Sequence, residues 1–341
     1  MSVGLSGAST KMYLRNPSEP QLRGRLNIVA AFVAVLALGL AATGCGSEAP
    51  KKTAAASAPS WSFAARMLHR RSYTASAELG GKVYVAAGMV GNSGRPLDLF
   101  EQFDPAKNEW SSLTPLPESF SAGAAASLDG RIWVVGGNSE TTSGRQVFAY
   151  DVQRRRWTEE PSLPVPRTNL AVVANRGKLY AIGGLDPVEA TKTVFVYDLA
   201  TRRWSKAAPL PKALQALAAV VFRGEIWALG GRVRSGTIQR GVWIYNPRTN
   251  RWRPGPTLPT PMETLGTSAS DGRIDAVLEH NYFTYDASSS RWLRGPSLEI
   301  PRHALGVFTI NGTLYAIGGC IVPQLEDSSV VEKIALRRIG D

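Results

Sequence analysis

Polar side chains that could bind a small ligand recur at matching positions along this chain of 341 residues. They lie in the segments that follow six tryptophans, where three consecutive positions can be aligned. The first position holds Arg71, Phe120, Arg167, Leu214, Met262 and Arg302. The second holds Ser72, Ser121, Thr168, Gln215, Glu263 and His303, and the third holds Tyr73, Ala122, Asn169, Ala216, Thr264 and Ala304. A guanidinium group holds a carboxylate in a bidentate fork, so the aligned set could bind a carboxylate or a sugar.

Other chemistry has little support in the sequence. There is no GxSxG, HExxH, phosphate-binding loop or paired-cysteine metal motif. The three histidines, His69, His280 and His303, come from separate parts of the chain, and two cysteines are too few for a disulfide scaffold. We therefore expect no metal and no cofactor.

The tryptophans that frame these segments define an internal repeat. They stand at Trp61, Trp110, Trp157, Trp204, Trp252 and Trp292, with spacings of 49, 47, 47, 48 and 40 residues. Between them run apolar segments that mostly end in a glycine pair, such as IWVVGG and LYAIGG, followed by a Tyr-Asp or similar signature. Short β-rich runs bounded by glycine and Asx turns predict a small antiparallel sheet for each repeat. One such sheet cannot bury both faces, so the repeats are expected to stack radially.

The glycine pair, the Tyr-Asp signature and the tryptophan, at a period near fifty, resemble kelch repeats. The resemblance covers about residues 61–337 and implies an all-β propeller. We expect six blades, because the last repeat has a glycine pair and a terminal strand, VVEKIAL, but no tryptophan after it. The strand around Trp61 would then complete the sixth blade and close the ring.

The resemblance also implies a ligand site on the face formed by the links between blades. The expected contacts are Arg71, Ser72, Tyr73, Arg167, Thr168, Asn169, Gln215, Glu263, Arg302 and His303. The alternative for each arginine is that it braces neighbouring blades, as kelch arginines at this position often do. The main interpretation is a protein- or glycan-binding module.

A catalytic alternative comes from a second resemblance, to exported bacterial kelch mutarotases of N-acetylneuraminate. In such an enzyme one residue transfers protons while arginines hold the sugar carboxylate. Here Glu263 or His303 would be the acid–base residue, and Arg71, Arg167 and Arg302 would form the clamp.

The fifth repeat departs from the pattern in three ways. Leu278-Glu279 replaces the glycine pair, Asp275 replaces an aromatic residue, and the repeat has only 40 residues. Only Glu279-His280-Asn281 could turn between its second and third strands. The short turn is either drift in one blade or a notch through which a ligand enters.

The net charge is +12. We assign fifteen basic and nine acidic residues to the turns on the face opposite the links. This excess would attract anionic lipid headgroups or envelope polymers, or it only keeps the protein soluble.

The N-terminal segment predicts export. Basic residues precede an uncharged stretch from Leu26 to Gly44, and Ala42-Thr43-Gly44-Cys45 resembles a bacterial lipobox. The resemblance implies that Cys45 is lipidated; a retained transmembrane anchor is the alternative. We therefore predict a signal peptide (1–44), a flexible tether (45–60) and a propeller (61–341), bound to the membrane outside the cytoplasm. Maturation leaves a net charge of +9, and nucleic acid is not an expected partner of an exported chain.

Overall fold

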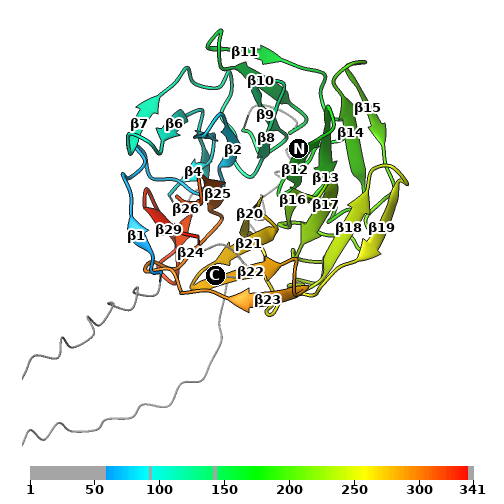
Figure 1. The fold of residues 1–341 in the computed structure, drawn as a ribbon. Helices are drawn as coiled ribbons and strands as arrows, with labels where there is room; N and C mark the ends of the chain where they lie inside the picture. Colours follow the sequence, from blue (N-terminus) through cyan, green and yellow to red (C-terminus); the bar gives the residue numbers. More distant parts are fainter. Residues whose placement is uncertain (1–58, 92–93, 141–143, 337–341) are drawn as a thin grey trace, which may run out of the picture. The chain divides into compact units, whose positions relative to one another are not determined.

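A computed structural model describes residues 59–91, 94–140 and 144–336. The predicted signal peptide, Cys45 and most of the predicted tether lie outside these residues. Within the described part all regular structure is β, and six four-stranded antiparallel sheets surround a central axis (Figure 1). The all-β propeller expected from the repeats is therefore confirmed.

Each sheet forms one blade, and its strands follow one another from the axis outward. Blade 1 contains β2 (Ala75–Leu79), β3 (Lys82–Ala86), β6 (Phe100–Asp104) and β7 (Glu109–Ser112). Blade 2 contains β8 (Ala124–Leu128), β9 (Arg131–Val135), β10 (Val147–Asp151) and β11 (Arg156–Glu159). Blade 3 contains β12 (Ala171–Asn175), β13 (Lys178–Ile182), β14 (Val194–Asp198) and β15 (Arg203–Lys206).

The remaining blades follow the same order. Blade 4 contains β16 (Ala218–Phe222), β17 (Glu225–Leu229), β18 (Val242–Asn246) and β19 (Arg251–Pro254). Blade 5 contains β20 (Gly266–Ser270), β21 (Arg273–Leu278), β22 (Asn281–Asp286) and β23 (Arg291–Arg294). Blade 6 contains β25 (Gly306–Ile310), β26 (Thr313–Ile317), β29 (Val331–Ala335) and, outermost, β1 (Ser62–Phe63).

Blade 6 joins the two ends of the described chain. Ser62 pairs with Lys333 and Phe63 with Glu332, so the N-terminal strand supplies the outer edge of the last sheet. Trp61, next to this strand, is buried, and its indole N–H donates to the Pro296 carbonyl at 2.8 Å. A strand from the far end of the chain thus covers an edge that would otherwise be unpaired.

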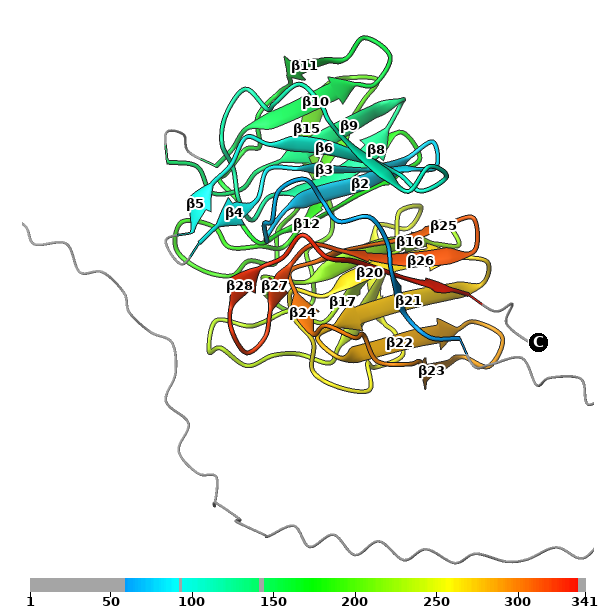
Figure 2. The same cartoon turned by 90° about the vertical axis from the view of Figure 1, so that its left-hand side faces the viewer.

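Strand direction defines two faces of the ring. Links between blades and loops between second and third strands lie on one side, which we call the loop face. Turns between first and second strands, and between third and fourth strands, lie on the other, the turn face. Figure 2 shows the hairpins β4 (Met89–Val90)–β5 (Arg95–Pro96) and β27 (Cys320–Ile321)–β28 (Glu326–Asp327) together at the loop face. The latter hairpin also pairs with β24 (Arg302–His303).

The apolar core lies between successive blades rather than at one centre. Six clusters of buried side chains fill the six interfaces; one of them packs Tyr84 and Phe100 of blade 1 against Ile132, Val134 and Phe148 of blade 2. The repeated tryptophans join the blades at the periphery, because each indole N–H donates to a backbone carbonyl of the preceding blade. The acceptors for Trp61, Trp110, Trp157, Trp204, Trp252 and Trp292 are Pro296, Ala65, Thr114, Pro161, Ala208 and Pro256, at 2.7–2.9 Å.

The glycine pairs meet the next blade at the loop face. The amide of Gly184 donates to the Leu214 carbonyl at 2.9 Å, and that of Gly231 donates to the Met262 carbonyl at 2.8 Å. A Cβ on Gly183 would lie 2.6 Å from the Leu214 carbonyl oxygen. Because no side chain fits at that distance, glycine at this position allows the two backbones to approach closely.

Candidate functional site

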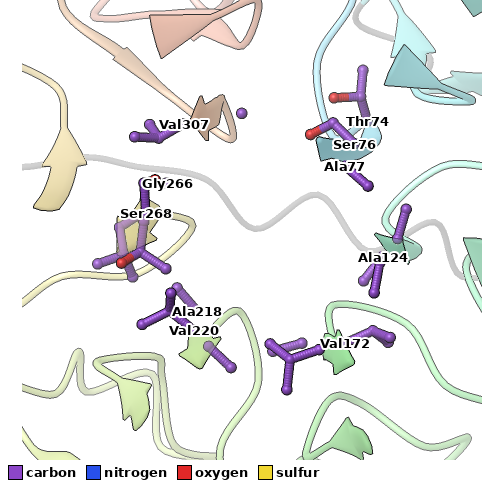
Figure 3. Close-up of a pocket in the computed structure, with 18 of the residues that line it drawn as sticks. Thr74, Ser76, Ala77, Ala124, Val172, Ala218, Val220, Gly266, Ser268 and Val307 are labelled. Carbon is purple, nitrogen blue, oxygen red and sulfur yellow. The ribbon is translucent and has the colours of Figure 1, made fainter. Parts of the chain in front are cut away.

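A channel of about 490 Å³ runs between the innermost strands of the blades. Its walls are mostly small side chains, including Ala77, Ala124, Ala218, Gly266 and Ser268, which surround the open centre in Figure 3. Among the described residues that line it, Glu78 is the only charged one. The channel can therefore hold a narrow group, and most of the charge available to a ligand lies at its ends.

The mouth on the loop face is framed by the third aligned position of each repeat. Tyr73, Ala122, Asn169, Ala216, Thr264 and Ala304 all line the channel, and all have φ between 50° and 55°. The amides of the last five each donate to the carbonyl of the corresponding residue in the preceding blade, at 2.8–3.0 Å. This left-handed conformation is rare for residues other than glycine. Here it turns each chain from the link into the innermost strand and connects neighbouring blades around the mouth.

The second aligned position lies just outside this frame. Ser72, Ser121, Thr168, Gln215 and His303 form β-bridges with the residue that follows the glycine pair of their own blade. Glu263 forms no such bridge, because the loop of blade 5 is reduced to the two-residue turn Glu279-His280. The short turn expected there is present, and it leaves Glu263 without a covering loop from its own blade.

Glu263 instead pairs with Arg232 of blade 4. The Nε of Arg232 donates to Oε2 of Glu263 at 2.5 Å, and the two side chains remain 31% and 17% exposed. Because both side chains of this ion pair are partly exposed, a polar ligand at the mouth can contact them. Arg232 was not among the predicted site residues. The sequence feature that could have identified Arg232 is its position directly after the glycine pair of the fourth repeat. A β-bridge to Gln215 places Arg232 beside the second aligned position.

His303 lies on the other side of the short turn. Burial lowers the pKa of His303, while the carboxylates of Glu279 and Glu263 act in the opposite direction. Its ring meets Tyr73 of blade 1 edge-on, with the ring centres 6.0 Å apart. The imidazole is therefore neutral at pH 7 and can accept a proton. We call Tyr73, Arg232, Glu263, Glu279 and His303 the mouth cluster.

Two of the predicted arginines lie inside the fold, which corrects the expectation that they contact a ligand. Arg71 is fully buried and pairs with Glu101 at 2.9 Å. Arg302 is also fully buried; it pairs with Glu332 at 2.5 Å and donates to the carbonyls of Gly318 and Val330. Both side chains therefore fix a link to the blade that follows it, and among the described residues none of their hydrogen bonds or ion pairs joins two neighbouring blades. We leave both residues out of the candidate site.

Arg167 is also largely internal. Its guanidinium lies 3.7 Å from Asp186 and 5.4 Å from the ring centre of Phe195, and the side chain is 3% exposed. The partner explains the difference from Arg71 and Arg302. Where blades 1 and 6 have a glutamate on the third strand, blade 3 has Phe195, so Arg167 rests on an aromatic face instead.

The other predicted residues are distributed around the ring. Ser72 is buried and donates to Asp327 at 2.6 Å. Thr168 and Asn169 belong to blade 3 and Gln215 to blade 4. The structure thus brings Tyr73, Glu263 and His303 together, adds Arg232 and Glu279 to them, and keeps Thr168 and Asn169 on another part of the mouth.

The remaining candidates offer little additional chemistry. Cys320 is buried, and burial raises the pKa of its thiol, so it is a poor nucleophile at neutral pH. No group of three histidine, cysteine or acidic side chains suited to a metal occurs within residues 59–91, 94–140 and 144–336. In the same part of the chain, no helix is long and apolar enough to cross a membrane.

Comparison with known protein families identifies the family of this propeller. The model of the KLHDC2/KLHL20/DRC7 Kelch-repeats domain matches residues 72–274, more than half of the chain. The chain belongs to the kelch-repeat family. Short segments also resemble human Kelch-like protein 35 (39% identity over 57 residues) and the F-box/kelch-repeat protein At1g30090 of Arabidopsis thaliana (37% over 59 residues). Each segment covers 17% of this chain, but only 9% and 15% of those two proteins.

A solved structure shares the whole fold of this kelch domain. The structure of YjhT superposes with a TM-score of 0.66, covering 79% of this chain and 95% of its own. The sequence identity is 16%, so the likeness extends to the fold and not to individual site residues.

Proposed function

We propose that this protein is an extracytoplasmic binding module, held at a bacterial membrane through Cys45, whose loop face binds a protein or glycan ligand. One observation carries the choice of face. Seven large apolar side chains are exposed among the described residues, and five of them lie in the links and loops of the loop face: Leu68, Val165, Val188, Ile238 and Leu325. The other two, Phe63 and Leu293, lie on outermost strands.

Single exposed apolar residues are ordinary, but their concentration on one face is not expected from packing alone. Interfaces between proteins combine apolar anchors with partly exposed charged and aromatic groups. The loop face supplies both kinds. Val188 and Ile238 lie on the loops of blades 3 and 4, and the mouth cluster lies at blades 4 to 6 and at Tyr73 of blade 1. This combination favours a protein ligand over a glycan.

Photocrosslinking tests this proposal. A photoreactive residue at Val188 or Ile238 is expected to form adducts in cells, whereas one at the exposed Gln153 on the turn face is the matched control. Arg232→Ala with Glu263→Ala should abolish the adducts without unfolding the protein. Adducts from Gln153 alone, or adducts that persist in the double variant, would contradict the proposed face. Glycan-array binding by the same double variant examines the carbohydrate alternative.

Membrane attachment has its own test. Cys45→Ser should release the protein from membranes, because a single cysteine carries the lipid in the proposed scheme. Tight retention of that variant would show that the apolar stretch from Leu26 to Gly44 anchors the chain instead.

A mutarotase of the N-acetylneuraminate type is the second candidate, and His303 is the residue that favours it. A neutral imidazole within electrostatic reach of Glu263 and Glu279 is suited to proton transfer. Because Arg71 and Arg302 are buried, Arg232 is the exposed arginine of the mouth cluster that would meet a sugar carboxylate. An anomer exchange rate of sialic acid that purified protein leaves unchanged by NMR would exclude this activity.

A further inference from the structure

On the turn face, acidic and basic side chains differ in how many of them form ion pairs. In the turns of this face, Glu109, Asp129 and Asp271 make no ion pair within the described residues. Three other acidic residues are engaged: Asp104 pairs with Lys82 at 3.1 Å, Asp151 with Arg154 at 2.7 Å, and Asp198 with Lys178 at 2.6 Å. The same carboxylates accept amide hydrogens of their own turns. Their negative charge is therefore directed into the turns and neutralised locally.

Many basic residues of this face are not engaged in this way. Exposed side chains that make no ion pair within the described residues occur in the turn between third and fourth strands of every blade that has one: Lys107, Arg155, Arg156, Arg203, Arg248, Arg251 and Arg291. Blades 1 to 5 thus each contribute positive charge to the rim of the same face. Such a set can approach one flat anionic surface simultaneously.

The sixth blade has no such turn, because the chain ends occupy its place. β1 runs antiparallel to β29, so the described chain enters and leaves the propeller at the turn face. Only residues 46–60 separate Cys45 from Trp61. Fifteen residues reach about 50 Å when fully extended and about 20 Å on average as a flexible chain. A membrane anchor at Cys45 would therefore keep this face, and not the loop face, close to the lipid.

We propose that the turn face docks on anionic lipid headgroups and that the loop face consequently points away from the membrane. The inference rests on the membrane attachment proposed above, but not on the ligand of the loop face. Electrostatic attraction to an anionic bilayer extends over about one Debye length, roughly 8 Å at physiological salt, so docking requires contact and depends on salt.

The experiment uses the full chain reconstituted in vesicles of phosphatidylcholine, with or without about one third phosphatidylglycerol. An environment-sensitive fluorophore is attached at Gln153→Cys on the turn face or at Val188→Cys on the loop face, and the lipids carry a quencher. We expect the Gln153→Cys probe to be quenched only on anionic vesicles, and quenching to be lost in 0.5 M salt while the chain stays bound. The Val188→Cys probe should be unaffected by lipid charge.

Two variants of equal net charge separate docking from a general charge effect. The first variant changes four turn-face residues: Arg155→Gln, Arg203→Gln, Arg248→Gln and Arg291→Gln. It should lower the ratio of docked to undocked protein at least tenfold, since each basic residue near an anionic surface contributes about fivefold. The second variant changes four loop-face residues: Arg70→Gln, Arg95→Gln, Lys192→Gln and Lys212→Gln. It should leave the ratio of docked to undocked protein unchanged. Denaturant unfolding verifies that both variants are folded.

Several outcomes would overturn docking. They are equal quenching on neutral and anionic vesicles, equal loss in both variants, or a Gln153→Cys probe that responds to a soluble anionic glycan but not to lipid. Release of the whole chain in 0.5 M salt would instead contradict the anchor, and the low-salt quenching would still decide docking.

Discussion

The fourth and fifth blades have the same strand order, yet they differ at three matched positions. Where blade 4 has Gly230-Gly231, Trp227 and the loop from 230 to 241, blade 5 has Leu278-Glu279, Asp275 and a two-residue turn. Blade 5 nevertheless keeps the contact to its neighbour: the Glu279 amide donates to the Arg302 carbonyl at 2.8 Å, with φ of 54°. At the second position of the pair, blade 5 therefore keeps the backbone bond and the left-handed conformation without a glycine.

The shortened loop changes the surroundings of Glu263. In blade 4 the residue after the glycine pair, Arg232, covers Gln215, whereas nothing from blade 5 covers Glu263 in this way. His303 lies within electrostatic reach of both Glu263 and Glu279 at this gap. The short turn thus leaves Glu263 uncovered beside His303, and whether it serves as a notch for ligand entry stays a prediction.

The largest expected difference between these blades concerns the first residue of the glycine pair. A Cβ on Gly230 would clash with the Met262 carbonyl oxygen, and its φ is 62°. Gly230→Ala should destabilise the protein by about 3 kcal/mol, from strain and overpacking. The matched Leu278→Ala should cost only about 1 kcal/mol, because it removes part of a half-buried side chain. Denaturant unfolding measures both, and equal losses would show that the two blades meet their neighbours alike.

The next difference lies at Asp275, which stands where blade 4 has Trp227. Asp275 is fully buried; it accepts hydrogen bonds from Tyr282 and Thr284, while its Oδ2 has no partner. Burial raises the pKa of Asp275, so the folded state favours the protonated form. Stability from this group is present below the unfolded pKa of about 3.9 and is lost as the pH rises through the folded value.

Asp275→Asn should therefore stabilise the protein at pH 7 by roughly 1–3 kcal/mol, the cost of an unsatisfied buried polar group. The gain should disappear toward pH 3. Unfolding curves across this range test the sign, and a variant that is less stable at pH 7 than at pH 3, relative to the parent, would contradict it.

A smaller effect is expected at Glu279, which takes the place of Gly231. Glycine adopts positive φ without steric cost but loses more freedom on folding, so Glu279→Gly should stabilise the protein by less than about 1 kcal/mol. The same change removes a carboxylate that raises the pKa of His303, and this pKa should fall. Glu279→Gln is the control, because it should lower the pKa of His303 without relieving the backbone. NMR titration of His303 that is unaffected by both changes would place Glu279 outside the mouth cluster.

The smallest effect on stability is expected in the turns between third and fourth strands, where Asp286 of blade 5 corresponds to Asn246 of blade 4. Hydrogen bonds from the hydroxyls of Ser289 and Ser288 lower the pKa of Asp286 to about 2. Its contribution to stability is present above the unfolded pKa of about 3.9 and is lost as the pH falls toward 2. Asp286→Asn should therefore lower stability at pH 7, where this contribution is present, and reduce the further loss between pH 4 and pH 2. Unchanged acid sensitivity would mean that this turn does not titrate with folding.

The fold could be predicted from the sequence because its determinants are local and repeated. The spacing of tryptophans, together with the glycine pairs and Tyr-Asp signatures found in most repeats, reports strand lengths and turns repeatedly along the chain. The site was harder to predict, because nothing in the aligned repeats distinguishes Arg71 and Arg302 from exposed arginines. Their burial depends on Glu101 and Glu332, which lie on third strands about thirty residues away, and only the strand register brings these pairs together. Arg232 was missed because its contact with Glu263 crosses from one blade to the next.

The pairing of β1 with β29 means that blade 6 is completed only after both strands have been synthesised. Ser62 and Lys333 are 271 positions apart, so β1 is synthesised long before the strand with which it pairs. A chain truncated anywhere before β29 leaves β1 without a partner and blade 6 without its outer half. Closure of the ring therefore requires synthesis as far as β29, and a product that stops earlier exposes unpaired strand edges to proteolysis and aggregation.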